Sequence, residues 1–192
     1  MAWELFTGVS IQQLSDNMDL FNAPLEELVS EMLSDKIIEA YDQRYFKVLT
    51  AYSFEKTNLK VHQHYLPVAH ISGVLDGFAR NDSSFDQGFL YFNDPTARLE
   101  SAADNEALLS FCDTVLFFSG LMPEAFTKKM ASKGYYEQLA VKGFYALHKR
   151  SIGDSYFSMM AHYFPRYRNA LGFMRQNLLA DNFSGEEEWA VQ

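Results

Sequence analysis

Residues 104–149, DNEALLSFCDTVLFFSGLMPEAFTKKMASKGYYEQLAVKGFYALHK, are the stretch in which helix signals, chain breaks and apolar periodicity agree. The run over 107–119 is almost entirely apolar or small. Asp104 and Glu106 stand at its start, where the positive end of a helix dipole favours acidic side chains. The pattern predicts a buried helix over 104–119.

A corner in the chain follows this predicted helix. Gly120 stands where a left-handed C-cap is expected, and Pro123 is placed to begin a short helix over 124–130. Ser132 can cap the next helix. One face of that helix is apolar and consists of Tyr136, Leu139, Ala140, Gly143, Phe144 and Leu147. This face needs a partner, and the run before the corner is the nearest one in the chain.

Two strings in this stretch, LFFSGLMPEAF and KGYYEQLAVKGFYAL, resemble the pattern of an uncharacterised family of bacterial helical proteins. The family pattern is a leucine and aromatic run, a glycine, a proline with a glutamate, then a tyrosine pair followed by a second glycine and tyrosine. The matching residues are Leu116, Phe117, Phe118, Gly120, Pro123, Glu124, Tyr135, Tyr136, Gly143 and Tyr145. The resemblance implies a bacterial helical domain and carries no catalytic residue across.

Length and composition are those of a protein with one sizeable core, since the chain has 192 residues and a hydrophobic content of 48%. No stretch rich in Pro, Gly or Ser is long enough to act as a linker. We therefore expect a single helical domain over 1–180, followed by an acidic C-terminal tail over 181–192. The one cysteine, Cys112, lies in the apolar run, so we expect a buried thiol in a reducing cytoplasm.

The sequence shows neither a secretion signal nor a membrane span. The first ten residues, MAWELFTGVS, lack a basic segment and an apolar segment of the kind found in signal peptides. The longest apolar run is short for a bilayer and contains Asp113. We therefore expect a soluble cytoplasmic protein without membrane contact.

Further helix signals lie on both sides of the deciding stretch. Predicted helices fall within 1–22, 24–33, 36–56, 67–78, 94–99 and 155–178. The last of these either kinks or restarts at Pro165. Residues 57–67 alternate apolar and polar side chains in the manner of an extended segment, and we predict an irregular crossover there.

These signals together predict an all-α fold. We expect a single-domain bundle of roughly six to eight helices around the buried helix 104–119. The alternative is an α+β domain with a small hairpin formed by 57–66 and 89–92.

Motifs that would settle a catalytic or metal-dependent function are missing. The chain has no glycine-rich phosphate loop, no H-E-x-x-H, no G-x-S-x-G and no cysteine pair. His62 and His64 would face one side of an extended segment, but two ligands make a poor zinc site. We therefore predict no metal, no cofactor and no catalytic residue.

Asp113 is the most informative polar residue, because an ionised carboxylate in a buried helix must find a partner. His162, Arg166, Arg168 or a tyrosine hydroxyl could supply one. One interpretation is a polar link between core helices. The other is a general acid or base in a pocket lined by Tyr and Met, which would make the protein an enzyme or a binder of small apolar ligands.

Charge is distributed unevenly along the chain. Residues 1–104 hold seven basic and sixteen acidic side chains, 105–180 hold nine and five, and the last twelve residues hold four acidic ones. A basic cluster is expected around the central helices and includes Lys128, Lys129, Lys133 and Lys142. The overall charge of −9 argues against nucleic-acid binding.

These observations favour a non-catalytic helical protein-interaction module, a bacterial regulator or adaptor whose partner is an unknown protein or a second copy of the chain. The tail has a feature of its own, because Trp189 directly follows three glutamates. An aromatic anchor beside acidic residues is typical of a docking segment. We therefore expect residues 186–191 to dock weakly on the lysine cluster, on their own molecule or on a neighbouring one. The alternative is a disordered end with no role in the fold.

Overall fold

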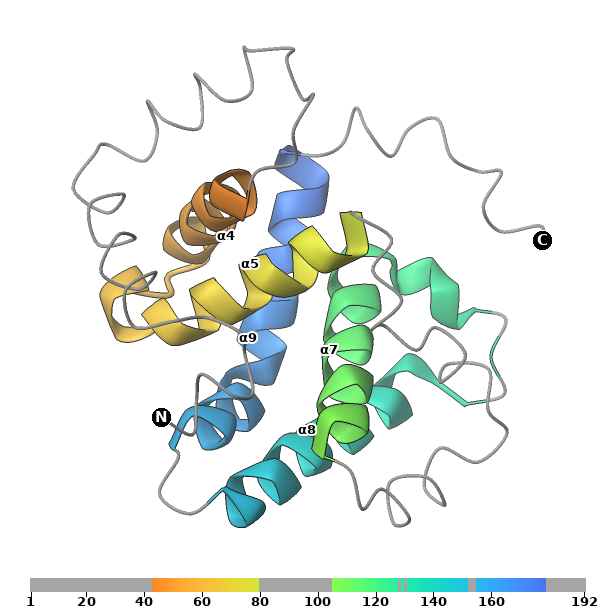
Figure 1. The fold of residues 1–192 in the computed structure, drawn as a ribbon. Coiled ribbons are helices and arrows are strands. Elements are labelled where there is room, and N and C mark those ends of the chain that lie inside the picture. Colours follow the sequence, from red (N-terminus) through yellow and green to blue (C-terminus); the bar gives the residue numbers. More distant parts are fainter. Residues whose placement is uncertain (1–42, 80–104, 128, 130, 152–154, 179–192) are drawn as a thin grey trace. The chain divides into compact units, whose positions relative to one another are not determined.

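A computed structural model describes residues 43–79, 105–127, 129, 131–151 and 155–178 (Figure 1). The regular elements within these ranges are all helical, and in order they are α4 (Gln43–Lys56), η2 (Val61–Gln63), α5 (Tyr65–Ala79), α7 (Asn105–Leu121), η4 (Pro123–Phe126), α8 (Lys133–Arg150) and α9 (Ser155–Asn177). The all-α prediction is therefore confirmed for this part of the chain. The helices predicted within 1–33 and 94–99, the hairpin half at 89–92 and the tail lie outside the described residues.

The chain divides into two compact units, Met1–Arg80 and Asn81–Gln192. In the first unit, α4 and α5 pack against each other and η2 joins them. Asn58 turns the chain between them with a positive φ of 60°, which asparagine tolerates better than most residues. The Val61 backbone N–H donates a hydrogen bond of 2.9 Å to Glu55 Oε1, so the turn is tied back to the end of α4.

No extended segment forms over 57–66, so one half of the alternative hairpin is wrong. Val61–Gln63 form a 3-10 helix, and α5 begins at Tyr65. His62 is exposed, whereas His64 is buried with its ring 6.3 Å from that of Phe54. The two imidazoles therefore do not share one side, because a tight helical turn places successive side chains differently from a strand.

The second unit is built from α7, α8 and α9, each of which packs against the other two. Helices α7 and α8 run in opposite directions. At the C-terminal end of α8, the Arg150 side chain donates a hydrogen bond of 3.1 Å to Asn105 Oδ1 at the start of α7. At the N-terminal end of α8, the Lys133 ammonium donates a hydrogen bond of 3.4 Å to the carbonyl oxygen of Ser119 near the end of α7. The short corner predicted between them contains η4.

Helix α8 follows the predicted pattern closely. Ser132 is its N-cap, and the Ser132 hydroxyl accepts a hydrogen bond of 3.3 Å from the Tyr135 backbone N–H. The buried residues of α8 are Tyr136, Leu139, Ala140, Gly143, Phe144 and Leu147, the same six that were predicted. Each fully buried large apolar side chain contributes about 1.5–3 kcal/mol relative to exposure, so this face decides how α8 lies.

Helix α9 continues through Pro165 from Ser155 to Asn177, so the predicted restart at this proline is wrong. Pro165 has no backbone N–H, and the carbonyl of Ala161 therefore lacks its helical donor. Phe164 and Tyr167, on either side of the proline, are 1% and 0% exposed. Because both sides of the proline are anchored by buried aromatic side chains, tertiary packing outweighs the local cost.

Gly120 is not a left-handed cap, because it lies within α7, which ends one residue later at Leu121. A Cβ atom built at Gly120 would lie 2.5 Å from Leu171 Cβ and 3.1 Å from the carbonyl oxygen of Arg168. The glycine is therefore needed for the close approach of α7 to α9. The predicted helix over 124–130 is shorter than expected and is the 3-10 helix η4.

A second close approach joins α7 to α8. A Cβ atom at Gly143 would lie 2.5 Å from Cys112 Sγ and 3.2 Å from Leu108 Cδ1. The Cys112 thiol also donates a hydrogen bond of 3.4 Å to the carbonyl oxygen of Ala140. The buried cysteine predicted from its apolar neighbours is confirmed, and its side chain fills the space that the absent Cβ of Gly143 leaves.

Gly120→Ala tests the close approach of α7 to α9. We expect it to lower the free energy of unfolding by about 1–3 kcal/mol, because the new methyl group meets a Cβ and a backbone carbonyl that cannot move aside alone. Urea denaturation followed by circular dichroism measures the change. The matched control is Gly134→Ala in the first turn of α8, where no atom lies within 4 Å of the added Cβ. This control should be neutral or stabilising by up to about 1 kcal/mol, and equal effects of the two substitutions would contradict the packing described.

Candidate functional site

The Asp113 carboxylate lies in the interior of the protein, as the sequence predicts. Asp113 is 5% exposed and stands in α7 between Cys112 and Thr114, both of which are 0% exposed. Burial, reinforced by the negative charge of Asp113, raises the pKa of the Cys112 thiol well above its ordinary value of 9.0. Cys112 is therefore a protonated packing residue and a poor nucleophile at neutral pH.

The three side chains considered as partners for Asp113 are all on α9. His162 and Arg166 occupy exposed positions, and the His162 ring stacks edge-on against Tyr163 at 4.8 Å. Arg168 is directed to Glu137, with 2.9 Å between Arg168 Nη1 and Glu137 Oε2. A ligand site formed by these residues with Asp113 stays a prediction.

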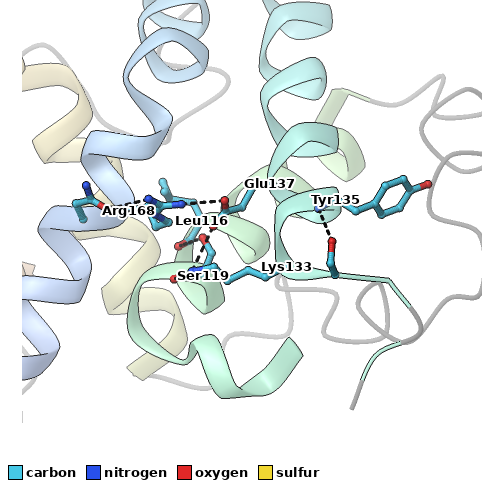
Figure 2. A network of polar contacts seen from close by, with 8 residues as sticks. Leu116, Ser119, Lys133, Tyr135, Glu137 and Arg168 are labelled. Carbon is cyan, nitrogen blue, oxygen red and sulfur yellow. Dashed lines mark hydrogen bonds and ion pairs between the residues drawn. The ribbon is translucent and has the colours of Figure 1, made fainter. Parts of the chain in front are cut away.

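Glu137 is the centre of a polar network between the helices (Figure 2). Its side chain is 15% exposed and forms ion pairs with Arg168 on α9 and with Lys133 one turn earlier on α8. The distance from Lys133 Nζ to Glu137 Oε1 is 3.6 Å, so this second contact is an ion pair rather than a hydrogen bond. One carboxylate thus holds a cation on each of two helices.

Lys133 extends the network to α7. Its ammonium donates to the carbonyl oxygen of Ser119 at 3.4 Å, in the last turn of α7, where the helix dipole favours a positive charge. Arg168 also donates from Nε and Nη2 to Asn169 Oδ1 at 3.2 and 2.9 Å. The guanidinium and the ammonium are therefore both engaged within the unit, and neither is left as an open cation site.

The four lysines predicted to form a basic cluster have different surroundings. Lys128 lies outside the described residues. Lys129 is half-buried, and burial lowers its pKa from the usual 10.5. Lys133 belongs to the network around Glu137. Lys142 is exposed on α8 and forms no ion pair with any described residue.

Lys142 is part of an exposed row that the sequence reasoning missed. Tyr135, Gln138, Lys142, Tyr145 and Lys149 are all exposed and follow one another at separations of three and four residues along α8. Residues at these separations form one stripe along a helix, opposite the buried face of α8. We call this row the tyrosine–lysine stripe.

The two tyrosines of the stripe are unusual in their exposure. Tyr135 is 38% and Tyr145 is 40% exposed, and they are two of the three large hydrophobic side chains that are exposed within the described ranges. Figure 2 shows the Tyr135 ring pointing away from Glu137 and Arg168. The signal was available in the sequence, because the six predicted buried residues of α8 define which residues lie opposite them.

Among the residues that the structure describes, no group of three or more His, Cys, Asp or Glu side chains is arranged to hold a metal ion. In the same residues, no helix combines the length and apolar character needed to cross a membrane. The stripe can bind by aromatic contact and by charge, through two phenol rings and two ammonium groups.

The Glu137–Arg168 pair should contribute measurably to stability because its carboxylate is mostly buried. A double-mutant cycle with Glu137→Gln and Arg168→Met should give a coupling of about 1–2 kcal/mol in urea denaturation. The matched comparison is Glu124–Arg175, which joins η4 to α9 at 2.7 Å but has a Glu124 side chain that is 58% exposed. The coupling of Glu124–Arg175 should stay below about 1 kcal/mol. A coupling as large as that of Glu137–Arg168 would contradict the claim that burial of the carboxylate strengthens the ion pair.

Cys112 should make stability depend on pH in the alkaline range. The folded thiol keeps its proton above pH 9.0 whereas the unfolded thiol loses it, so the free energy of unfolding should fall as pH rises beyond that value. The limiting slope is about 1.4 kcal/mol per pH unit. Urea denaturation at several pH values should show this slope in the unchanged protein and a smaller slope in Cys112→Ala. Identical slopes would mean that Cys112 is accessible to solvent in the folded state.

In comparisons with protein-family models, curated protein sequences and solved structures, no match to this chain was found. The resemblance to an uncharacterised bacterial family therefore stays a prediction. Several of its residues are explained by packing here, since Gly120 and Gly143 permit the two close helix approaches and Tyr136 is buried. Tyr135 and Tyr145 are exposed and have no such explanation.

Proposed function

We propose that the protein is a non-catalytic helical interaction module that binds its partner through the tyrosine–lysine stripe on α8. One observation carries the proposal. Tyr135 and Tyr145 are exposed beside Lys142 and Lys149, and neither lysine forms an ion pair with any described residue. Tyrosines are enriched where proteins bind one another, and the neighbouring lysines add a positive charge that favours an acidic partner.

The chemistry of the stripe favours an acidic protein segment that carries an aromatic side chain. Carboxylates of the partner would pair with Lys142 and Lys149, and its aromatic ring would pack on Tyr135 or Tyr145. Exposed ion pairs contribute up to about 1 kcal/mol each, and an aromatic pair adds about 0.5–1.5 kcal/mol. The sum corresponds to weak, reversible binding, which is typical of a regulator or adaptor.

The stripe is supported by a preorganised scaffold. The opposite face of α8 is buried, and Glu137 ties α8 to Arg168 of α9. A rigid helix loses little freedom on binding, so more of the contact energy appears as affinity. We infer that this scaffold belongs to a larger cytoplasmic bacterial domain of roughly six to eight helices, centred on the buried helix 104–119. The alternative function, an apolar ligand or a reaction at Asp113, rests on the burial of Asp113 alone.

Fluorescence polarisation tests the proposed function. The probe is a short fluorescein-labelled peptide with the repeat Glu-Glu-Trp, and the control probe has the repeat Lys-Lys-Trp. We expect the full-length chain to bind the acidic peptide only. Tyr145→Ala combined with Lys142→Glu should weaken this binding by about tenfold, because a ring contact is lost and an attraction becomes a repulsion.

Arg166→Glu is the matched control, since Arg166 is also an exposed cation of the second unit and belongs to α9 rather than to α8. It changes the net charge as much as Lys142→Glu does and should leave the affinity nearly unchanged. If Arg166→Glu weakens binding as strongly as the stripe variant, attraction is governed by overall charge and the stripe is not a docking face. Absence of peptide binding by the unchanged chain would overturn the proposed partner class.

A further inference from the structure

We propose that the tyrosine–lysine stripe is covered by the chain's own residues 186–191, so that the tail competes with external partners for the same surface. This inference rests on the proposed function of the stripe and deepens it by naming a partner. Residues 186–191 lie outside the described part of the chain and read EEEWAV. Their chemistry is that of the partner class derived above, acidic side chains followed directly by an aromatic one.

Ion pairs join the C-terminal half of α9 to η4 and to the beginning of α8, where the stripe starts. Arg175, in the last turn of α9, is ion-paired with Glu124 of η4, which precedes α8. Arg168 is paired with Glu137, only two residues after Tyr135 of the stripe. The C-terminal half of α9 and the beginning of α8 are therefore at the same end of the unit.

The segment between α9 and the acidic residues is comparable in length with the stripe. The described chain ends at Leu178, and eight peptide units separate it from Glu186. A fully extended chain of this length spans about 26 Å, and a flexible one has a root-mean-square span of about 16 Å. From Tyr135 to Lys149 the stripe is about 21 Å long, as follows from the helical rise. Because the stripe begins where α8 is paired with α9, the proposal places the acidic residues on its first half, which contains Tyr135 and Lys142.

Among the three lysines of the predicted cluster that the structure describes, Lys142 is the one that is exposed and forms no ion pair with a described residue. Lys133 is engaged with Glu137 and with the Ser119 carbonyl, and Lys129 is half-buried. Glu137 would repel the tail, but it is mostly buried and already paired with two cations. We therefore assign Glu186, Glu187 and Glu188 to the side of Lys142, and the Trp189 ring to the neighbouring tyrosines.

Tethering makes this weak contact effective. A short flexible linker holds the tail at an effective concentration in the millimolar range near the stripe, so even a weak contact is partly occupied. An external acidic segment must displace the tail before it binds, and its apparent affinity falls accordingly. The tail would thereby restrict the module to partners that are more acidic or more aromatic than the tail itself.

Trp189 fluorescence in the full-length chain tests the inference, with Trp3→Phe as background so that Trp189 is the sole tryptophan. At an ionic strength of about 0.01 M, where the Debye length is about 30 Å, we expect blue-shifted emission that acrylamide quenches weakly. At about 1 M the Debye length is about 3 Å, and the emission should shift to that of exposed tryptophan. Lys142→Glu with Tyr145→Ala should give the exposed spectrum at both salt concentrations, and Arg166→Glu should retain the salt-dependent shift.

Exchanging the charges of Lys142 and Glu187 tests whether these two residues contact each other. Lys142→Glu alone and Glu187→Lys alone should each reduce the blue shift, and the two combined should restore it. An emission spectrum that is exposed and identical in all variants would overturn the inference, as would a blue shift that grows with protein concentration, since the occupant would then be a second copy. The outcome is separable from that of the proposed function, because binding of the Glu-Glu-Trp peptide at the stripe would persist when the tail does not dock.

Discussion

The second unit depends on the close approach of α7 to its two neighbouring helices, which two glycines make possible. Gly120 lets α7 approach Leu171 on α9, and Gly143 lets α8 approach Cys112 on α7. Contacts at this distance leave no room for a methyl group, so the relative positions of the three helices are narrowly determined. Burial of the large aromatic residues on α8 and α9 then follows, because their rings fill the space that these approaches define.

The polar network acts at the ends of the same packing. Glu137 is mostly buried and would be costly if it were unpaired, but Lys133 and Arg168 compensate its charge from two helices. The network also shows which cationic side chains of this unit are already paired with a carboxylate. Lys133 and Arg168 are engaged with Glu137, whereas Lys142 and Lys149 lie opposite the buried face of α8, together with the exposed tyrosines.

Prediction from the sequence was most accurate for α8, where helical periodicity and capping indicate the same structure. The six buried residues of α8 and its Ser132 cap follow from period and capping, and all were confirmed. Prediction failed where tertiary contacts overrode a local preference. Gly120 has the local signature of a cap but serves a helix contact, and Pro165 has the signature of a helix break but is held between buried aromatic residues. The stripe was missed because aromatic and basic residues were considered separately, although their common face was implied by the buried one.

The overall acidity of the chain and the basic character of the stripe act over different distances. At physiological ionic strength the Debye length is about 8 Å, so charges elsewhere on the protein scarcely affect a ligand bound at Lys142. A net charge of −9 therefore does not determine what the stripe binds. The net charge does matter for competition between ligands. A strongly acidic chain presents its own carboxylates to any basic surface at high effective concentration. In the proposed function, a partner must therefore bind the stripe better than the chain's own acidic segments do.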